Sequence, residues 1–388
     1  YDETKTKTKI AAIVKDGKII EQANEGDEVE IILSETPFYP EMGGQVGDKG
    51  RLIVHSPKSP ALNGVNSVQS QAEIIDTQKP VENLIIHRAK IKKGIIKTGE
   101  TVETEIDIDR RKNIMRNHTA THLLHKSLRQ IIGTHIVQRG SQVADDRFRF
   151  DFSQPAQLKK EELALIEKYV NEKILENLKV TTKITTVDEA KKMGALALFG
   201  EKYGEKVRCV ITGGEGNPES VELCGGTHCK STGEIGQFII LSEGSIGSGL
   251  RRIEAITGME AYNFMKNQRE IIDEMAEILK SSRAEVITKL QKLADDKKKL
   301  EKGISKTPKI QENDLLKNLK EINGIKLLAV KTETSSIDEL RSTSDNLKNK
   351  IKSGIVVLGS VIAEKPTIIV SITKDLDDKF DARIIVKA

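Results

Sequence analysis

The sequence predicts an α+β protein of several domains, and three patterns along the chain support that prediction. Short alternating apolar and polar runs fill the N-terminal part. Helical and strand-like segments then interleave, and a long charged helical region precedes a strand–helix–strand pattern. From the N-terminus onward we expect a small β-barrel, an α+β core, a long helical hairpin and a partial α/β C-terminal domain.

The predicted barrel covers residues 1–109. Runs such as KIAAIVKDGKII and DEVEIILSETPF have strand alternation and are separated by Gly, Pro, Asn and Asp, which favour turns. Many short strands with frequent turns are typical of a small barrel. We expect the polar stretch SPKSPALNGVNSVQSQ (residues 56–71) to be a long exposed loop or an insertion.

The predicted core covers residues 110–257. The segment DRRKNIMRNHTATHLLHKSLRQII has apolar residues at helical spacing and ends at Gly133. A strand-like RFRFDFS, a second helix from about Leu158 to Leu178 and further strands follow. Helices that interleave with antiparallel strands predict an α+β core.

Residues 258–320 are predicted to form a helical linker. Apolar residues recur there in a heptad pattern, which we interpret as a solvated helical hairpin in preference to a dimerising coil. Residues 321–388 alternate strand, helix, strand and strand, and their last residues, DARIIVKA, continue a strand-like pattern. We therefore expect an incomplete α/β domain at the end, and the first residues, YDETKTKTKI, suggest a chain cut within a longer protein.

Composition excludes several classes of protein. Charged residues make up 31% of the chain and hydrophobic residues 37%, and no run of about 18 apolar residues predicts a membrane helix. The 62 Lys and Arg against 58 Asp and Glu give a net charge of +4, too balanced to indicate nucleic-acid binding by itself. The three cysteines suit a reducing cytoplasmic setting better than a disulfide framework.

Two short motifs predict a metal site, RNHTATHLLH and VELCGGTHCK. His118 and His122 are four apart on a predicted helix, the usual way for one helix to supply two nitrogens to zinc. Cys224 and His228 flank GGT, whose glycines permit a tight turn. One cysteine and three histidines form a good tetrahedral set, so we predict one zinc ion per chain on these side chains.

Other residues compete for these roles. Cys209 lies in an apolar strand and is expected in the core, and Cys229 could replace Cys224 only with a different turn. His125 could face the same site, although an exposed helix position is the preferred interpretation. Thr119 stands where a zinc protease of the HExxH type has its glutamate, which disfavours that class.

The two motifs at this separation closely resemble the editing domain of alanyl-tRNA synthetases. Three other stretches match as well: TPFYPEMGGQVGDKG, VQRGSQVADDRFRFDFS and GSIGSGLRRIEAITG. Standalone alanyl-tRNA editing proteins and the editing domain of threonyl-tRNA synthetase carry related motifs. The resemblance covers nearly the whole chain. It implies a synthetase fragment with the editing domain and part of the C-terminal region, which ends inside a DHH-associated domain.

The resemblance implies hydrolysis of the aminoacyl ester of Ser-tRNA(Ala) and Gly-tRNA(Ala). The same four side chains would be metal ligands. Gln138 would orient water or the ester, with a strand-end hydrogen bond as the structural alternative. Thr121 would recognise the serine hydroxyl, with a hydrogen bond to its own helix backbone as the alternative.

The resemblance also implies partners and a wider function. The acceptor end of tRNA(Ala) would be the partner. The intact cytoplasmic enzyme could dimerise through its C-terminal region and would ligate alanine using ATP in an aminoacylation domain that this sequence lacks. A standalone alanyl-tRNA editing deacylase and a non-catalytic tRNA-binding module with structural zinc are the alternatives.

Two glycine-rich stretches are candidates for contact with tRNA. Gly43, Gly44 and Gln45 could bring backbone amides close to the ribose or the terminal phosphate, although a barrel turn explains them equally well. Arg251 and Arg252 suit phosphate contacts because the guanidinium group is a fixed fork of donors. A buried ion pair with Glu254 is the rival interpretation for one of these arginines.

Overall fold

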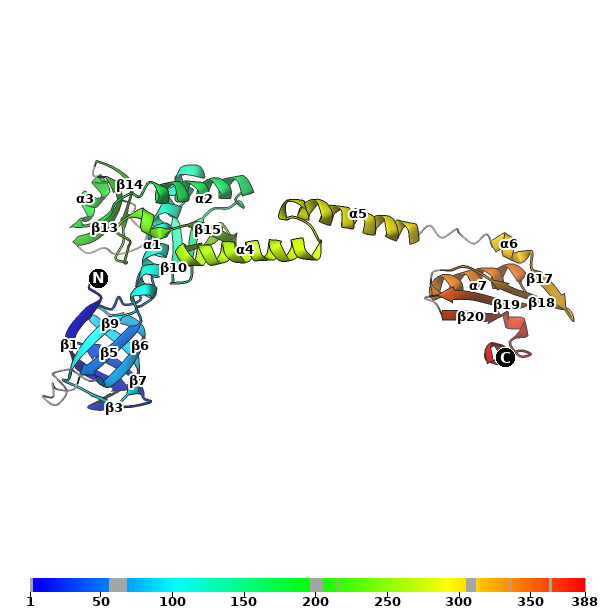
Figure 1. Ribbon diagram of the computed structural model, residues 1–388, viewed down its shortest axis with the longest axis horizontal. Coiled ribbons are helices and arrows are strands. Elements are labelled where there is room, and N and C mark those ends of the chain that lie inside the picture. The colour runs from blue at the N-terminus through cyan, green and yellow to red at the C-terminus, as the bar shows by residue number, and fades with distance from the viewer. Residues whose placement is uncertain are drawn as a thin grey trace. The chain divides into compact units, whose positions relative to one another are not determined.

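The computed structural model divides the chain into two compact units, Tyr1–Arg269 and Glu270–Ala388, each described by itself (Figure 1). No helix in the described part of the chain is long and apolar enough to cross a bilayer. The structure describes residues 3–55, 68–195, 205–214, 216–304, 312–334, 336–362 and 365–387.

Six antiparallel strands close into a barrel at the start of the first unit, which confirms the predicted barrel. β1 pairs with β9 and closes the ring, and apolar residues alternate inward to form its core. Short strands β2 (Lys18–Ile20), β3 (Gln22–Asn24) and β8 (Ile95–Lys97) flank the ring, and residues 56–67 of the predicted long loop lie outside the described residues. Around the ring the order is β1 (Lys5–Lys15), β4 (Glu28–Leu33), β7 (Leu84–Lys93), β6 (Val68–Val81), β5 (Gly50–His55) and β9 (Thr101–Ile106).

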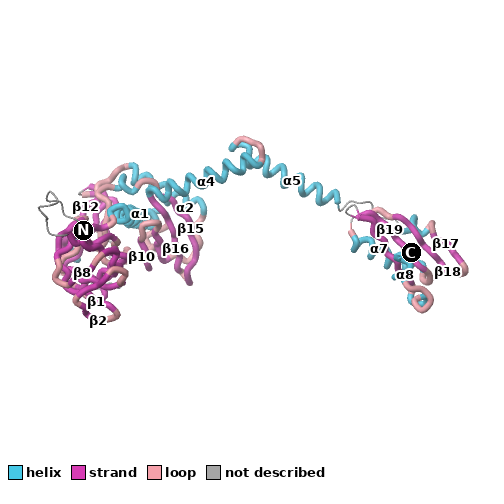
Figure 2. Tube along the Cα trace, turned by 60° about the horizontal axis from the view of Figure 1, so that its bottom comes forward, coloured by secondary structure: helices cyan, strands magenta, loops and turns pink. Residues whose placement is uncertain are grey.

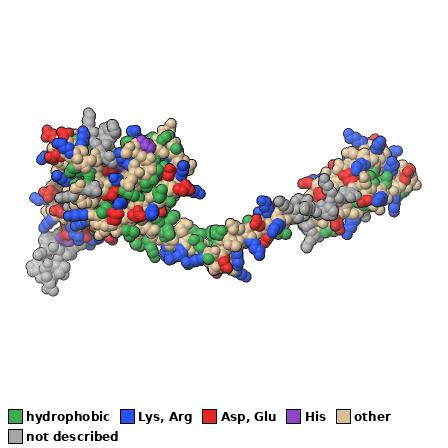
Figure 3. Space-filling view, turned by 90° about the horizontal axis from the view of Figure 1, so that it is seen from above, with side chains coloured by type: hydrophobic (Ala, Val, Ile, Leu, Met, Phe, Trp, Pro, Cys, Tyr) green, Lys and Arg blue, Asp and Glu red, His purple; other side chains and the backbone are tan. Residues whose placement is uncertain are grey.

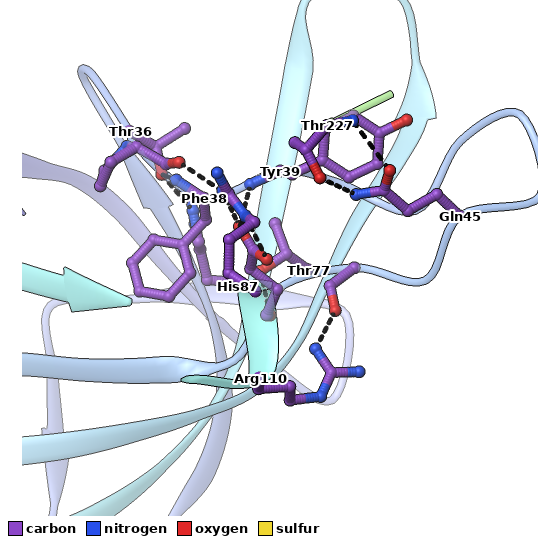
Figure 4. A network of polar contacts seen from close by, with 12 residues as sticks. Thr36, Phe38, Tyr39, Gln45, Thr77, His87, Arg110 and Thr227 are labelled. Carbon is purple, nitrogen blue, oxygen red and sulfur yellow. Dashed lines mark hydrogen bonds and ion pairs between the residues drawn. The ribbon is translucent and has the colours of Figure 1, made fainter. Parts of the chain in front are cut away.

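A buried histidine ties the barrel wall to the β4–β5 loop (residues 34–49). His87 on β7 donates from Nδ1 to the Ile31 carbonyl at 2.9 Å, so its neutral ring accepts at Nε2 from the Thr36 hydroxyl at 2.8 Å (Figure 4). Burial disfavours the charged ring and lowers the pKa of His87 to about 4, although the hydrogen bond to Ile31 opposes the shift. The neutral ring therefore follows from burial, since a hydroxyl can either donate or accept at Nε2.

We expect acid to destabilise the barrel through His87. The pKa of His87 falls from 6.5 to about 4 on folding, so below pH 6.5 the unfolded chain takes up a proton that the folded barrel refuses. The stability is complete above pH 6.5 and is lost toward pH 4, by up to about 3 kcal/mol. Hydrogen exchange of barrel amides, corrected for intrinsic rates, measures this loss. His87→Gln should lose clearly less stability on acidification, and equal losses in the two proteins would contradict the assignment.

The α+β core of the first unit is built around helix α1 (Ile108–Ile131). The Asp107 side chain accepts from the Arg110 backbone N–H and caps the start of this helix. The buried face of α1 packs on a four-stranded sheet whose strand β11 contributes three fully buried phenylalanines at alternate positions. The sheet order is β10 (Gln138–Val143), β11 (Phe148–Ser153), β16 (Leu250–Thr257) and β15 (Phe238–Gly247), with α2 (Lys160–Leu175) packed against α1 and β15 (Figure 2).

A second, three-stranded sheet completes the core. Cys209 is buried there beside Val207 and Val221, so its predicted core position is confirmed. After this sheet the chain makes the turn that carries Cys224 and reaches a short 3-10 helix, η2 (Thr232–Ile235). The sheet consists of β12 (Val180–Thr186), β13 (Lys206–Gly214) and β14 (Asn217–Leu223), with α3 (Val187–Lys192) packed against β12 and β13.

Two long helices follow, α4 (Gly258–Ile278) and α5 (Val286–Ile304). The predicted helical region is therefore interrupted, because residues 279–285 form a turn with the short η3 (Arg283–Glu285). Val286 is buried at this turn, whereas Met275 and Leu290 of the heptad pattern are exposed. The packing of these two helices as a hairpin stays a prediction.

The second unit ends in a four-stranded sheet, which agrees with the predicted α/β pattern. β18 and β19 pair in parallel through the crossover helix α7 (Ile337–Ile351), and the other pairs are antiparallel. The strand-like interpretation of the last residues is wrong, because Ala382–Lys387 form helix α8. The Asp381 side chain accepts a hydrogen bond from the Arg383 backbone N–H at the start of this helix. The other elements are α6 (Glu312–Leu316), β17 (Leu319–Ile322), β18 (Ile325–Lys331), β19 (Ile355–Ile362), β20 (Lys365–Ile372) and η4 (Lys374–Leu376).

Lysine and arginine side chains alternate with acidic ones over the visible surface of each unit (Figure 3). No single-sign patch dominates that view, in keeping with the small net charge.

Candidate metal centre

Four side chains with metal-binding atoms converge between α1 and the turn after β14. His118 and His122 project from one face of α1, and Cys224 and His228 lie at the two ends of the glycine turn. One donor atom from each lies within 4.8 Å of all the others. The Cys224 Sγ is 3.4 Å from Nε2 of His118 and 3.3 Å from Nε2 of His228.

These distances fit a tetrahedral zinc ion. Zn–N bonds of 2.0–2.1 Å and Zn–S bonds near 2.3 Å place nitrogen and sulfur roughly 3.5 Å apart around one ion. The observed separations from Cys224 Sγ match that spacing. A donor set of one thiolate and three imidazoles also suits zinc chemically.

The electrostatics of the cluster favour a thiolate among neutral and charged imidazoles. Burial opposes ionisation of Cys224, but His118 and His228 outweigh it and hold the pKa of the thiol well below its usual range. Burial, with His118, lowers the pKa of His228 to about 3. At His122 burial also opposes charge, but the Glu222 carboxylate and the Cys224 sulfur raise the pKa to about 9. Metal binding would therefore release a proton from His122.

The turn that carries Cys224 is fixed from both sides. Arg208 on β13 donates from Nη1 to the carbonyls of Cys224 and Gly226, at 2.8 and 2.9 Å. A Cβ at Gly226 would press into the His118 ring and lie 2.8 Å from the Gln45 side-chain oxygen. The glycine is therefore required by the close approach of the turn to His118.

We expect Gly226→Ala to displace the His118 ring and to weaken zinc binding by at least about tenfold, a loss typical of disturbed metal surroundings. Gly225→Ala is the matched control, because a Cβ there meets only the end of the Met42 side chain, at 3.4 Å. Competition with a chelator measures both affinities. Equal affinities in the two variants would mean that the turn tolerates a methyl group at Gly226.

A cavity of about 500 Å³ opens beside the cluster, lined by His118, His122 and Cys224 among others. The predicted residues Thr121 and Gln138 both line it. The Thr121 hydroxyl donates to the Asn117 carbonyl at 2.8 Å, which is the backbone contact expected of a helix threonine. The Gln138 amide nitrogen lies 3.3 Å from Ser141 Oγ.

Gly43 and Gly44 form a turn and also line the cavity. Their φ angles are +60° and +83°, and a Cβ at Gly44 would meet the Ser141 carbonyl. Gln45 is fully buried behind His118 and bonds to that ring and to Thr227. In this structure Gln45 thus faces His118, one of the four candidate ligands.

The two arginines proposed for phosphate contact are engaged in ion pairs. Arg251 pairs with Glu243, and Arg252 with Asp151 through contacts of 2.6 and 2.8 Å. Neither ion pair uses Glu254, the rival partner named from the sequence. A phosphate contact by either arginine stays a prediction.

The sequence did not predict a buried contact between His125 and Glu222 next to the cluster. His125 is buried, contrary to the preferred exposed position, and its Nδ1 lies 3.0 Å from the Glu222 carboxylate. Glu222 also lies 3.8 Å from His122 Nε2. The signal was present in the sequence, since Glu222 lies at the end of β14 only two residues before Cys224. Cys229 is buried outside the group of four donors.

Two family models match parts of the chain. The model described as tRNA synthetases class II (A) matches residues 1–110, which include the barrel. The model described as threonyl and alanyl tRNA synthetase second additional domain matches residues 207–254, which include Cys224 and His228.

Curated relatives match over nearly the whole chain. The alanine–tRNA ligases of Bacillus subtilis and Haemophilus influenzae are each 42% identical to it, over 98% and 100% of its length. That of Pelotomaculum thermopropionicum is 41% identical over 98%. The chain spans 42–43% of the length of these relatives.

Proposed function

The chain belongs to the alanyl-tRNA synthetase family, and from that membership we propose that it carries the family's editing reaction. The reaction is hydrolysis of the ester that joins serine or glycine to a mischarged tRNA(Ala). One observation carries the proposal. Four candidate metal ligands from α1 and the β14 turn meet at one point, and three of them line a cavity large enough for an aminoacyl group.

The chemistry follows from what lines the cavity. A zinc ion held by the four side chains would lower the pKa of a bound water or polarise the ester carbonyl. Gln138 supplies an amide that can hold a water or the ester oxygen in place. Thr121 donates its hydroxyl proton to Asn117, which leaves its oxygen lone pairs to accept from the hydroxyl of a seryl group.

We expect Thr121→Val to reduce hydrolysis of Ser-tRNA(Ala) and to shrink its preference over Ala-tRNA(Ala) by roughly 1–3 kcal/mol in transition-state terms. Exclusion by size cannot spare the smaller alanine, so the hydroxyl must be recognised by hydrogen bonds. Valine keeps the volume of threonine and lacks the hydroxyl. Gly-tRNA(Ala) is the internal control, because glycine has no hydroxyl and its hydrolysis should change less. Equal losses on the two substrates would assign Thr121 to helix support.

One observation favours a second candidate. Four protein donors around one ion resemble a closed structural site, which suits a tRNA-binding module without catalysis. Incubation of the chain with preformed Ser-tRNA(Ala) and Ala-tRNA(Ala) separates the candidates. An editing enzyme releases serine over many turnovers and spares alanine. A binding module shifts the mobility of both tRNAs and releases neither amino acid.

The wider proposals follow from the family. We propose that the acceptor end of tRNA(Ala) enters the cavity, and that the relevant compartment is the cytoplasm. The whole protein would ligate alanine to tRNA(Ala) with ATP, and its C-terminal region could form a dimer. The chain itself is expected to form no Ala-tRNA(Ala) from alanine, ATP and tRNA.

A further inference from the structure

The side chain of Gln45 reaches from the barrel to His118. Its Oε1 lies 2.7 Å from His118 Nδ1. The same oxygen accepts the Thr227 backbone N–H at 2.9 Å, while the Gln45 Nε2 donates to the Thr227 hydroxyl at 2.9 Å (Figure 4). A backbone N–H can only donate, so the oxygen of the amide must face Thr227 N. An amide oxygen can only accept. The proton between Gln45 and His118 therefore belongs to His118 Nδ1.

The contact of Thr119 with His228 likewise requires a proton on Nδ1 of that ring. Its hydroxyl has a single proton, which it donates to the Met115 carbonyl at 2.8 Å. The hydroxyl oxygen accepts from the Cys229 backbone N–H at 3.1 Å and lies 3.2 Å from His228 Nδ1. Since the hydroxyl proton is already used, the contact requires His228 Nδ1 to donate.

We propose that Gln45 and Thr119 are positioning residues that fix the tautomers of His118 and His228. A neutral imidazole has one N–H, so a proton held on Nδ1 leaves the Nε2 lone pair for a metal. Both Nε2 atoms are the ones that face Cys224 Sγ, at 3.4 and 3.3 Å. This proposal rests on the proposed metal centre. Gln45 and Thr119 are not ligands themselves but orient two of the ligands.

The barrel holds Gln45 in place through the β4–β5 loop. Asp48, three residues later, accepts the Tyr39 backbone N–H at 2.7 Å and forms a buried ion pair with Arg111 at the start of α1. The Asp48 carbonyl accepts from the Thr77 hydroxyl at 2.9 Å on β6. The loop is thus anchored to the barrel wall and to the helix that carries His118. Through this loop the barrel positions Gln45 beside the candidate metal centre.

Nitrogen-15 spectroscopy of histidine-labelled full chain tests the tautomers directly. We expect Nδ1 of both His118 and His228 to give the shifts of a protonated nitrogen. His118→Gln and His228→Gln identify the signals. Spectra at mildly alkaline pH without metal keep this test separate from the question of zinc binding. An unprotonated Nδ1 on either ring would overturn the proposal for that ring.

Matched variants test the consequence for metal binding. Gln45→Leu removes the acceptor and should weaken zinc affinity about 10- to 100-fold, whereas Gln45→Glu keeps an acceptor and should stay within about threefold of wild type. Thr119→Val and Thr119→Ser form the equivalent pair for His228. Chelator competition gives the affinities, and circular dichroism confirms folding. Equal affinities within both pairs would overturn the proposal. If a Leu or Val variant does not fold, the spectra of the wild-type chain decide.

Discussion

Replacing Cys224 with alanine is expected to remove zinc and hydrolysis of Ser-tRNA(Ala) together. The cysteine is the anionic donor of the group, since the neighbouring histidines hold the pKa of its thiol well below the usual range. Three imidazoles without the thiolate should bind zinc more than about 100-fold more weakly, a greater loss than outer-shell changes cause. Elemental analysis after purification without chelator and single-turnover deacylation measure the two effects.

Cys229→Ala is the matched control for that change. Cys229 lies five residues beyond Cys224 on the same turn, and burial raises the pKa of its thiol to about 12, so it is a poor metal donor. The control should keep its zinc and its activity. If Cys224→Ala kept both as well, Cys224 would not be a required ligand and the centre would need another donor.

Arg111→Met is expected to destabilise the first unit by about 3–5 kcal/mol, because it leaves the buried Asp48 carboxylate without its cation. Arg111 is 2% exposed, and its Nε lies 2.9 and 3.0 Å from the two Asp48 oxygens. Its Nη2 also donates to the Pro37 carbonyl at 3.2 Å. Hydrogen exchange of amides in the barrel and in α1 gives the loss in free energy of opening.

A surface pair serves as the control for this effect. Arg51 pairs with Glu105 on the outside of the barrel, and Arg51→Met should cost no more than about 1 kcal/mol, because solvent screens an exposed pair. The two variants remove the same side chain and differ in burial. A loss for Arg111→Met as small as that for Arg51→Met would show that Asp48 is hydrated or paired in another way.

Local patterns in the sequence predicted most of the fold. The alternation in β9, with buried Val102, Thr104 and Ile106, is the kind of signal that identifies barrel strands. The capped, apolar α1 was equally clear. The end of the chain was not, because ARIIVK is apolar enough for a strand and becomes helical only after the turn at Asp381.

The convergence of the four candidate ligands was predictable because each motif brings two of them together locally. His118 and His122 share a helix face, and Cys224 and His228 share a turn. Their surroundings were not predictable, since Gln45 meets His118 across 73 residues and Thr227 across 182. No periodicity connects such distant segments. From the sequence alone, Gln45 is therefore a candidate for contact with tRNA, and Thr119 serves only as an argument against a zinc protease.

X-ray absorption at the zinc edge of the full chain tests the central claim most directly. The account predicts one zinc ion per chain with one sulfur at about 2.3 Å and three imidazole nitrogens at about 2.0–2.1 Å. The sulfur should disappear from the Cys224→Ala spectrum of any zinc that remains. A wild-type spectrum without sulfur, or with two sulfurs, would contradict a centre built from His118, His122, Cys224 and His228.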